Sequence, residues 1–122
     1  SGIKRVLLDQ QTLSGIGNIY ADEALWRSKL HYDQPAASIS PAKARELLQN
    51  VRQILAKAVE EGGTSFDEQY KNVNGESGYF AVSLNAYGMT GQPCNRCGRE
   101  IKRDSWMNRG SHFCPNCQKL RA

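Results

Sequence analysis

"CNRCGREIKRDSWMNRGSHFCPNC", residues 94–117, holds all four cysteines of the 122-residue chain. They form two Cys-x-x-Cys pairs with sixteen residues between the pairs. Disulfides of a small secreted protein, or a redox pair, are the alternatives to a metal site. No signal-peptide pattern supports the first, and two pairs at this separation are typical of tetrahedral zinc. We therefore predict one Zn²⁺ per chain, held by Cys94, Cys97, Cys114 and Cys117.

The residues between the cysteine pairs predict a small β-hairpin. Residues 99–103 (REIKR) and 111–113 (SHF) are the expected strands, and residues 104–110 (DSWMNRG) would connect them. Each cysteine pair would then occupy a tight turn at the open end of the hairpin, as in a zinc ribbon. Because so short a segment buries little apolar surface, we expect the metal to supply most of its folding free energy.

Positive charge is concentrated in the cysteine-rich tail, which we define as residues 94–122. The whole chain has a net charge of +4, whereas the tail has seven basic and two acidic side chains, a net charge of +5. Four zinc-bound thiolates would lower the charge of the tail to about +3. This asymmetry indicates either an anionic partner such as nucleic acid or an ordinary solvated face, and charge alone does not separate the two.

Upstream of the tail, apolar residues recur at helical spacing. Residues 3–10 and 18–29 predict two short helices. A longer third helix is expected to begin at Ser40-Pro41, which suit the N-cap and the first helical position, and to end at Gly62-Gly63. Its apolar stripe should face the core and comprises Ala44, Leu47, Leu48, Val51, Ile54, Leu55, Ala58 and Val59. Residues 81–87 predict a short strand, and residues 64–80 predict a long loop.

Two glycines, Gly15 and Gly17, precede the second predicted helix in "LSGIGNIYADEAL", residues 13–25. A helix N-terminus presents unpaired N–H groups, and glycines in the turn before it would let a phosphate approach closely. Asn18 could add a side-chain donor there. A simple glycine-containing turn between packed helices explains the same residues equally well. Taken alone, this motif leaves both interpretations open.

Together, several segments resemble the C-terminal half of formamidopyrimidine-DNA glycosylases, most of all those of actinobacteria. The segments are residues 7–26 (LLDQQTLSGIGNIYADEALW), 75–80 (GESGYF), 86–88 (AYG) and 94–118, and they occur in the family's order. The resemblance implies a mainly α fold, in which a helix–two-turn–helix bundle precedes a small C-terminal β-hairpin zinc finger. The implied domains are residues 1–88, including the lesion-loop region 64–80, and residues 89–122.

The resemblance also implies roles for particular residues in binding DNA. Asn18 matches an asparagine that contacts the phosphates beside the lesion, and Tyr87 matches a tyrosine near the DNA backbone. Arg109 matches a hairpin-tip arginine that grips a phosphate and is assigned a part in δ-elimination. With Gly15 and Gly17, these three are the predicted DNA-binding residues. The loop that covers an everted damaged base matches Tyr70, Lys71, Asn72, Val73, Asn74, Gly75, Glu76, Ser77, Gly78, Tyr79 and Phe80.

Family members excise oxidised purines, such as 8-oxoguanine and formamidopyrimidines, and then nick the abasic strand. Their nucleophile is an N-terminal proline, followed by a glutamate, in a β-rich lobe that this chain lacks. We therefore expect the chain to be the DNA-binding portion of a longer glycosylase and AP lyase, and to be inactive alone. Its expected partners are double-stranded DNA with damaged or abasic sites and the missing lobe.

Other expectations concern location, packing and an alternative function. We expect a cytoplasmic, nucleoid-associated protein, because no apolar run approaches the ~20 residues of a membrane span and zinc thiolates suit a reducing compartment. For His31 and His112 we expect surface or packing roles and no metal ligation. For Trp26 and Trp106 we expect support of the core or the hairpin, with stacking on bases as the alternative. The alternative function is a standalone zinc-ribbon adaptor that binds nucleic acid or another protein without enzymatic activity.

Overall fold

Three helices and one β-hairpin make up the regular structure in the computed structural model, which describes residues 2–9, 14–60, 84–107 and 109–120. The elements are α1 (Ile3–Asp9), α2 (Ser14–Ser28), a 3₁₀ helix (Ala36–Ser38), α3 (Pro41–Glu60), β1 (Lys102–Trp106) and β2 (Arg109–Phe113). The predicted mainly α fold with a C-terminal hairpin is confirmed. Along the described part of the chain, no helix is long and apolar enough to cross a membrane.

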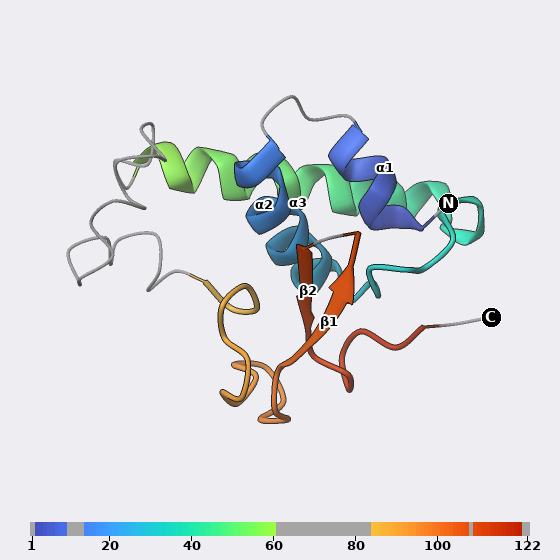
Figure 1. The fold of residues 1–122 in the computed structure, drawn as a ribbon. Helices are drawn as coiled ribbons and strands as arrows, with labels where there is room; N and C mark the ends of the chain where they lie inside the picture. The colour runs from blue at the N-terminus through green and yellow to red at the C-terminus, as the bar shows by residue number, and fades with distance from the viewer. Residues whose placement is uncertain (1, 10–13, 61–83, 108, 121–122) are drawn as a thin grey trace.

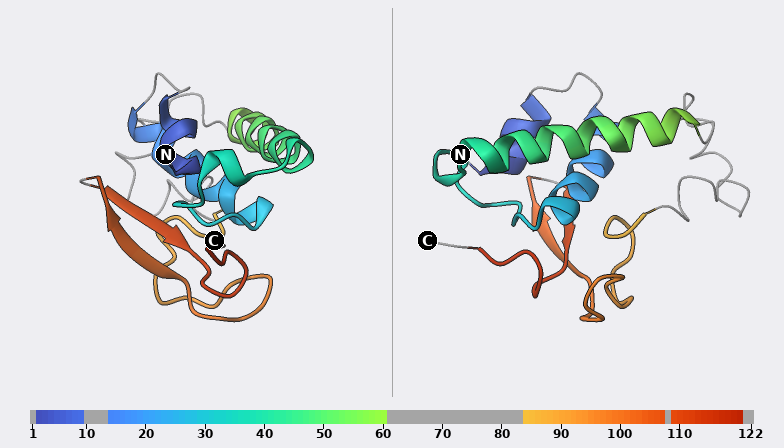
Figure 2. Two further views of the ribbon diagram at one scale, coloured as in Figure 1. Left: turned by 90° about the vertical axis from the view of Figure 1, so that its right-hand side faces the viewer. Right: turned by 180° about the vertical axis from the view of Figure 1, so that it is seen from behind.

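Helix α2 is the centre of the molecule. Every residue from Gly17 to Trp26 is buried, so all sides of this segment are covered. Figures 1 and 2 show α1 and α3 on one side of α2 and the hairpin on the other, and α2 contacts all three elements. A helix covered all round can carry polar residues only where partners are available, and this determines the contacts of three of its buried polar side chains, Asn18, Asp22 and Glu23.

The predicted start of α3 is confirmed by its cap. The Ser40 hydroxyl accepts a hydrogen bond from the Lys43 amide at 3.1 Å, and the Ser40 carbonyl accepts one from the Ala44 amide at 2.9 Å. The predicted stripe, in contrast, is too wide. Leu47, Val51 and Ile54 are buried, but Leu48 is 51% exposed and Leu55 is 37% exposed. Helix α3 packs on α2 along one narrow face, so the flank of the stripe stays in solvent.

The two glycines lie inside α2 and not in a turn before it. The sequence predicted a helix start at Asn18, but α2 begins at Ser14, so Gly15 and Gly17 belong to its first turn. A glycine in a helix costs roughly 1 kcal/mol relative to alanine, and tertiary packing outweighs this cost. The prediction that these glycines open the backbone ahead of the helix is therefore wrong, although both still lie at the helix N-terminus.

The strand predicted over residues 81–87 is wrong for its described part, residues 84–87, which form a turn. The Glu23 carboxylate of α2 accepts hydrogen bonds from three successive amides: Asn85 at 2.8 Å, Ala86 at 2.7 Å and Tyr87 at 2.8 Å. Amides on successive residues of a strand point in opposite directions, so one carboxylate cannot collect three of them from a strand. Residues 81–83 lie outside the described part of the chain, as does the whole predicted loop, residues 64–80.

The hairpin is longer toward its tip than predicted. Strands β1 and β2 pair antiparallel from Lys102 opposite Phe113 to Trp106 opposite Arg109. Residues 104–106, predicted to be connection, belong to β1, and contacts from α1 and from the segment after α2 hold them in place. The Tyr32 hydroxyl donates to Asp104 Oδ2 at 2.9 Å, and the Lys4 ammonium lies 4.8 Å from the centre of the Trp106 ring.

A second apolar cluster, separate from the helical core, lies beneath the tail. It comprises Trp26, Ala86, Cys94, Ile101 and Cys114. Trp26 belongs to α2, Ala86 to the turn held by Glu23, and the others to the tail. Helix α2 therefore contributes to both cores, and the predicted boundary between residues 88 and 89 stays a prediction.

Candidate metal centre and nucleic-acid interface

The four predicted zinc ligands converge. The sulfur atoms of Cys94, Cys97, Cys114 and Cys117 all lie within 4.8 Å of one another. Four Zn–S bonds of about 2.3 Å in a tetrahedron place the sulfurs about 3.8 Å apart, so this cluster fits one zinc ion. Other groups of three or more potential ligands of this kind were not found in the described residues.

Backbone amides point at three of the four sulfurs. The Arg96 amide donates to Cys94 at 3.4 Å, the Arg99 amide to Cys97 at 3.5 Å and the Cys117 amide to Cys114 at 3.4 Å. Hydrogen bonds, first from the Arg99 amide and then from the Asn116 side chain, lower the pKa of Cys97 to about 6, which suits a thiolate ligand. Burial raises the pKa of Cys114 to about 12. For Cys114 a bound Zn²⁺ would supply the positive charge that deprotonates the thiol.

The start of α2 and the hairpin meet beside Arg109. The Asn18 side-chain amide donates to the Gly110 carbonyl at 3.3 Å, and the Lys4 ammonium donates to the same carbonyl at 3.1 Å. Lys4 also donates to the Ser111 hydroxyl at 2.9 Å. Two segments that the sequence assigned to DNA binding, the Gly15–Asn18 stretch and the Arg109 end of the hairpin, are thus joined by the Asn18 hydrogen bond, and Lys4 of α1 adds two more to the same end of the hairpin.

A buried ion pair supports this junction from below. The Lys4 ammonium lies 2.8 Å from Asp22 Oδ1, and Asp22 Oδ2 accepts the backbone amide of His112 at 3.0 Å. His112 Nδ1 is also 3.0 Å from Asp22 Oδ2, and the Tyr87 ring lies 4.6 Å from the His112 ring. The predicted DNA-binding residue Tyr87 is therefore held against β2 by His112 and by Glu23 through its amide.

Asn18 is 7% exposed, and its carbonyl oxygen Oδ1 is buried with no hydrogen-bond partner. Its amide nitrogen faces Gly110, so Asn18 holds the hairpin in this structure, and its phosphate contact stays a prediction. Arg109 and Gly15 are placed here by their backbones, at the start of β2 and in the first turn of α2. The lesion-loop residues 70–80 lie outside the described residues.

Sequence reasoning missed four charged residues at this junction: Lys4, Asp22, Glu23 and Arg103. Adding a Cβ atom to Gly110 would bring it into overlap with Nε of Arg103, so this arginine lies directly over the glycine that follows Arg109. The adjacent carboxylates of Asp22 and Glu23 were the available signal. They interrupt an otherwise apolar stretch of α2, and a buried carboxylate needs a partner.

His31 and Trp106 have packing contacts with other rings. His31 stacks on Tyr32 with ring centres 4.3 Å apart and meets Phe113 edge-on at 5.1 Å. Trp106 meets Tyr32 edge-on at 6.4 Å. Burial lowers the pKa of His31, which keeps the ring neutral inside this aromatic group.

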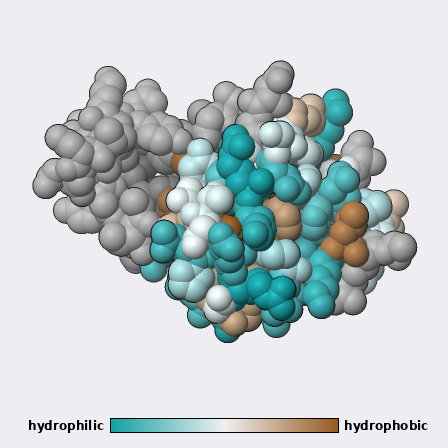
Figure 3. Space-filling model, turned by 60° about the horizontal axis from the view of Figure 1, so that its bottom comes forward, coloured by the Kyte–Doolittle hydropathy of each residue, from teal (hydrophilic) through white to brown (hydrophobic). Residues whose placement is uncertain are grey.

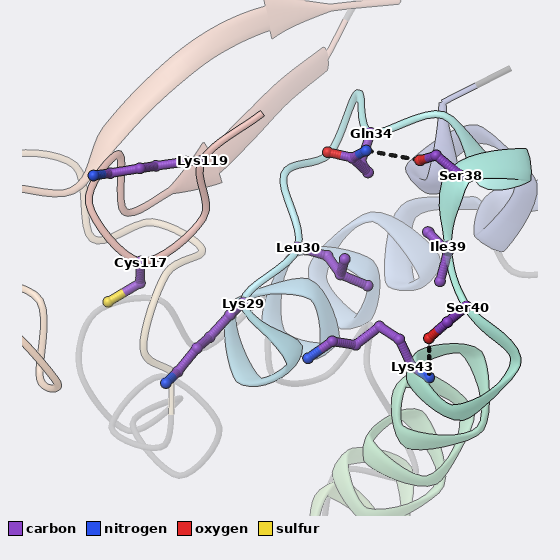
Figure 4. A pocket seen from close by; sticks show the side chains of 9 residues that line it. All are labelled: Lys29, Leu30, Gln34, Ser38, Ile39, Ser40, Lys43, Cys117 and Lys119. Carbon is purple, nitrogen blue, oxygen red and sulfur yellow. Dashed lines mark hydrogen bonds between the residues drawn. The ribbon is translucent and has the colours of Figure 1, made fainter. Parts of the chain in front are cut away.

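A pocket of about 370 Å³ lies between the end of α2, the 3₁₀ helix, the start of α3 and the tail. Several of its polar groups are partnered within the protein. Gln34 donates to the Ser38 hydroxyl at 2.7 Å, and the Lys43 ammonium donates to the Ser28 carbonyl at 3.1 Å. Figure 4 shows that the amino groups of Lys29, Lys43 and Lys119 do not converge, so this pocket is not the candidate anion site. Seen from below, the described surface is mostly hydrophilic with isolated apolar residues (Figure 3).

Two family models match the chain. Residues 1–69 match the formamidopyrimidine-DNA glycosylase H2TH domain. The chain belongs to this family. Residues 91–120 match a zinc finger found in formamidopyrimidine-DNA glycosylase and isoleucyl-tRNA synthetase, and the four cysteines fall inside that match. The predicted family membership is confirmed, as is the single zinc site that the cysteines fit.

Relatives in this glycosylase family match nearly the whole chain. The formamidopyrimidine-DNA glycosylase of Leifsonia xyli is 63% identical over 120 residues, which are 98% of this chain and 40% of the relative. The Lactococcus lactis enzyme bound to DNA with an AP site has a TM-score of 0.79 at 36% identity, over 98% of this chain and 41% of that one. The same enzyme bound to DNA containing FAPY-dG has a TM-score of 0.80 at 38% identity, over 98% and 42%. The chain thus spans about 40% of the length of its curated relatives.

Proposed function

We propose that this chain is the DNA-binding portion of a base-excision-repair DNA glycosylase and AP lyase that acts on oxidised purines. Its role is to grip the DNA backbone around the lesion. The observation that carries the proposal is the junction at Gly110, where Asn18 and Lys4 both donate to one carbonyl next to Arg109. The proposal is supported by the family match and by relatives solved with AP-site DNA and FAPY-dG DNA.

The physical basis of the grip is phosphate recognition without base readout. The first turn of α2 presents backbone N–H groups and the positive end of a helix dipole. Arg109 at the start of β2 would add a guanidinium able to bind a phosphate with two hydrogen bonds. Contacts of this kind fix the position of a protein on DNA but carry no sequence information, which suits recognition of damage at any sequence.

We further propose that the chain alone neither excises a base nor cleaves the strand. Nothing in its described site offers the amine nucleophile that the resemblance assigns to another lobe, and Arg109 would act in δ-elimination only alongside that lobe. Residues 70–80 are proposed to cover an everted base. As the partner is chromosomal DNA, we propose that the protein works in the bacterial cytoplasm.

Binding to a labelled duplex with an abasic-site analogue tests this function, using the zinc-loaded 122-residue chain and fluorescence anisotropy. We expect Arg109→Ala and Asn18→Ala each to weaken binding by about 1–3 kcal/mol, or roughly 5- to 150-fold. The matched controls are Arg99→Ala, an exposed arginine of the tail, and Asn50→Ala, an amide that donates to the Ser28 hydroxyl at 2.8 Å on the far side of α2. Both controls should bind within about twofold of the unchanged chain.

Salt and substrate complete the test. The affinity should fall steeply as salt rises, because phosphate contacts release counterions. A gel assay on 8-oxoguanine duplex should show no incision by this chain. Unchanged affinity in both Asn18→Ala and Arg109→Ala would favour the adaptor alternative, which the glycosylase relatives do not support. Incision by the chain alone would overturn the proposal that it binds DNA without cleaving it.

A further inference from the structure

The side chains of Trp26 and Arg96 donate hydrogen bonds to Cys94 and Cys117, respectively. The indole N–H of Trp26 donates to Cys94 Sγ at 3.4 Å across 68 positions of sequence. The Arg96 guanidinium donates through Nε to Cys117 Sγ at 3.2 Å. Trp26 lies on α2, so one of these two donors comes from the helical part of the molecule.

The two donors also hold each other. The Arg96 Nη2 group donates to the Trp26 backbone carbonyl at 2.7 Å, and the guanidinium carbon lies 4.0 Å from the centre of the Trp26 ring. Because Trp26 is only 8% exposed, its ring orientation is set by the surrounding core. The indole and the guanidinium are therefore both held in place, each with an N–H directed at a different cysteine.

We infer that Trp26 and Arg96 are positioning residues of the metal centre, which orient the Cys94 and Cys117 thiolates and offset part of their charge. Four thiolates around one Zn²⁺ carry a net charge of −2, and donated N–H groups and a nearby guanidinium lower the cost of that charge. Backbone amides already serve Cys94, Cys97 and Cys114, but the described hydrogen bonds to Cys117 Sγ come from Arg96 alone.

A packing role by itself does not require these donors. A phenylalanine would fill the space of Trp26 almost as well, and a half-exposed side chain at position 96 could be any polar residue. Packing alone does not explain why an N–H group points at Sγ of Cys94 and another at Sγ of Cys117. Outer hydrogen-bond partners of metal ligands typically change metal affinity by roughly 10- to 100-fold. The inference concerns metal retention and does not rest on the proposed DNA function.

Zinc transfer from the 122-residue chain to a colorimetric chelator gives the first readout. We compare Trp26→Phe, which keeps an aromatic ring but removes the N–H, with Arg96→Met, which keeps the stem but removes the guanidinium. Each variant is first shown to hold one zinc per chain and to retain its helical circular dichroism. We expect zinc release to be roughly 10-fold faster in each variant. The controls are Trp106→Phe and Arg99→Met, whose side chains belong to the same hairpin and tail, and both should release zinc at the unchanged rate.

Cobalt substitution gives a second readout that packing does not affect. An N–H donated to a thiolate stabilises the sulfur lone pair, so its loss should move the sulfur-to-Co²⁺ charge-transfer absorption to longer wavelength. We expect this shift in Trp26→Phe and Arg96→Met and not in the controls. Arg96→Lys, which restores one charged donor, should recover part of the release rate. Faster release without the spectral shift, or release within twofold of the unchanged chain in both variants, would overturn the inference.

Discussion

The Lys4 ammonium donates a hydrogen bond to the Gly110 carbonyl at 3.1 Å, although the two residues are 106 positions apart. Lys4 is fully buried, and its other contacts include the Asp22 carboxylate, the Ser111 hydroxyl and the face of Trp106. A lysine this deep is stable only if its charge is balanced and its donors are used. The first helix of the chain therefore fixes the end of the hairpin that bears Arg109.

Replacing Lys4 should be strongly destabilising. Lys4→Met leaves the Asp22 carboxylate buried without its cation, and we expect a loss of about 3–5 kcal/mol in the free energy of unfolding, measured by urea denaturation. Adding Asp22→Asn should recover part of this loss, because the amide oxygen can still accept the His112 amide without carrying a charge. Lys102→Met is the control, since its 3.6 Å pair with Glu100 is exposed and should be worth less than about 1 kcal/mol. A Lys4→Met chain as stable as this control would contradict the role of the ion pair.

Glu23 should be needed as a carboxylate, because it accepts three successive amides of the 84–88 turn. In Glu23→Gln one acceptor oxygen is replaced by an NH₂ group that faces an amide donor. We expect a loss of about 1–3 kcal/mol in the free energy of unfolding. Hydrogen exchange should report faster opening at Asn85, Ala86 and Tyr87. Glu46→Gln, an exposed residue paired with Lys43 at 3.2 Å, is the matched change and should have little effect on either measurement.

Tyr32 should make the stability depend on pH in alkaline solution. Burial, followed by the hydrogen bond to Asp104, raises the pKa of Tyr32 from 10.0 to about 12. The unfolded chain therefore loses this proton first, so the contribution of Tyr32 is complete below pH 10 and is lost as the pH rises toward 12. Tyr32→Phe should remove this part of the pH dependence. The prediction would be contradicted if a tyrosinate absorbance titration showed every tyrosine with a pKa of 10 or below.

Removing zinc should release the tail while the helices persist. The helical core consists of residues such as Leu7, Leu25, Leu47 and Ile54, and none of its members is a cysteine. Cys94 and Cys114, in contrast, belong to the second cluster with Trp26 and Ile101. With excess chelator we expect fast hydrogen exchange across residues 94–118, a red shift of Trp26 emission in a Trp106→Phe background, and most of the helical circular dichroism retained. Loss of helix and hairpin in one cooperative step would show instead that the two parts cannot fold separately.

The features that depend on residues close together in the sequence were predictable from it. The cysteine spacing was enough for the metal centre, and Ser40, Pro41 and the apolar periodicity were enough for α3. The contacts at Gly110 were not predictable from pattern, because Lys4, Asn18 and Asp22 find their partners about 90 to 106 positions away. The wrong strand over residues 84–87 has the same origin. Three amides of this segment donate to the Glu23 carboxylate, and nothing in the segment's own sequence indicates that partner.

The position of Lys4 near one end of the chain and of Gly110 and Ser111 near the other has a consequence during synthesis on the ribosome. The partners of Lys4 on the hairpin are translated more than 100 residues after Lys4 itself. Until they emerge from the ribosome, α1 and α2 can associate, but Lys4 and Asp22 remain hydrated. Contacts of such long sequence separation form late and slowly. The helices can therefore pack together before the hairpin exists, and the hydrogen bonds from Lys4 to Gly110 and Ser111 form only after the hairpin has been translated.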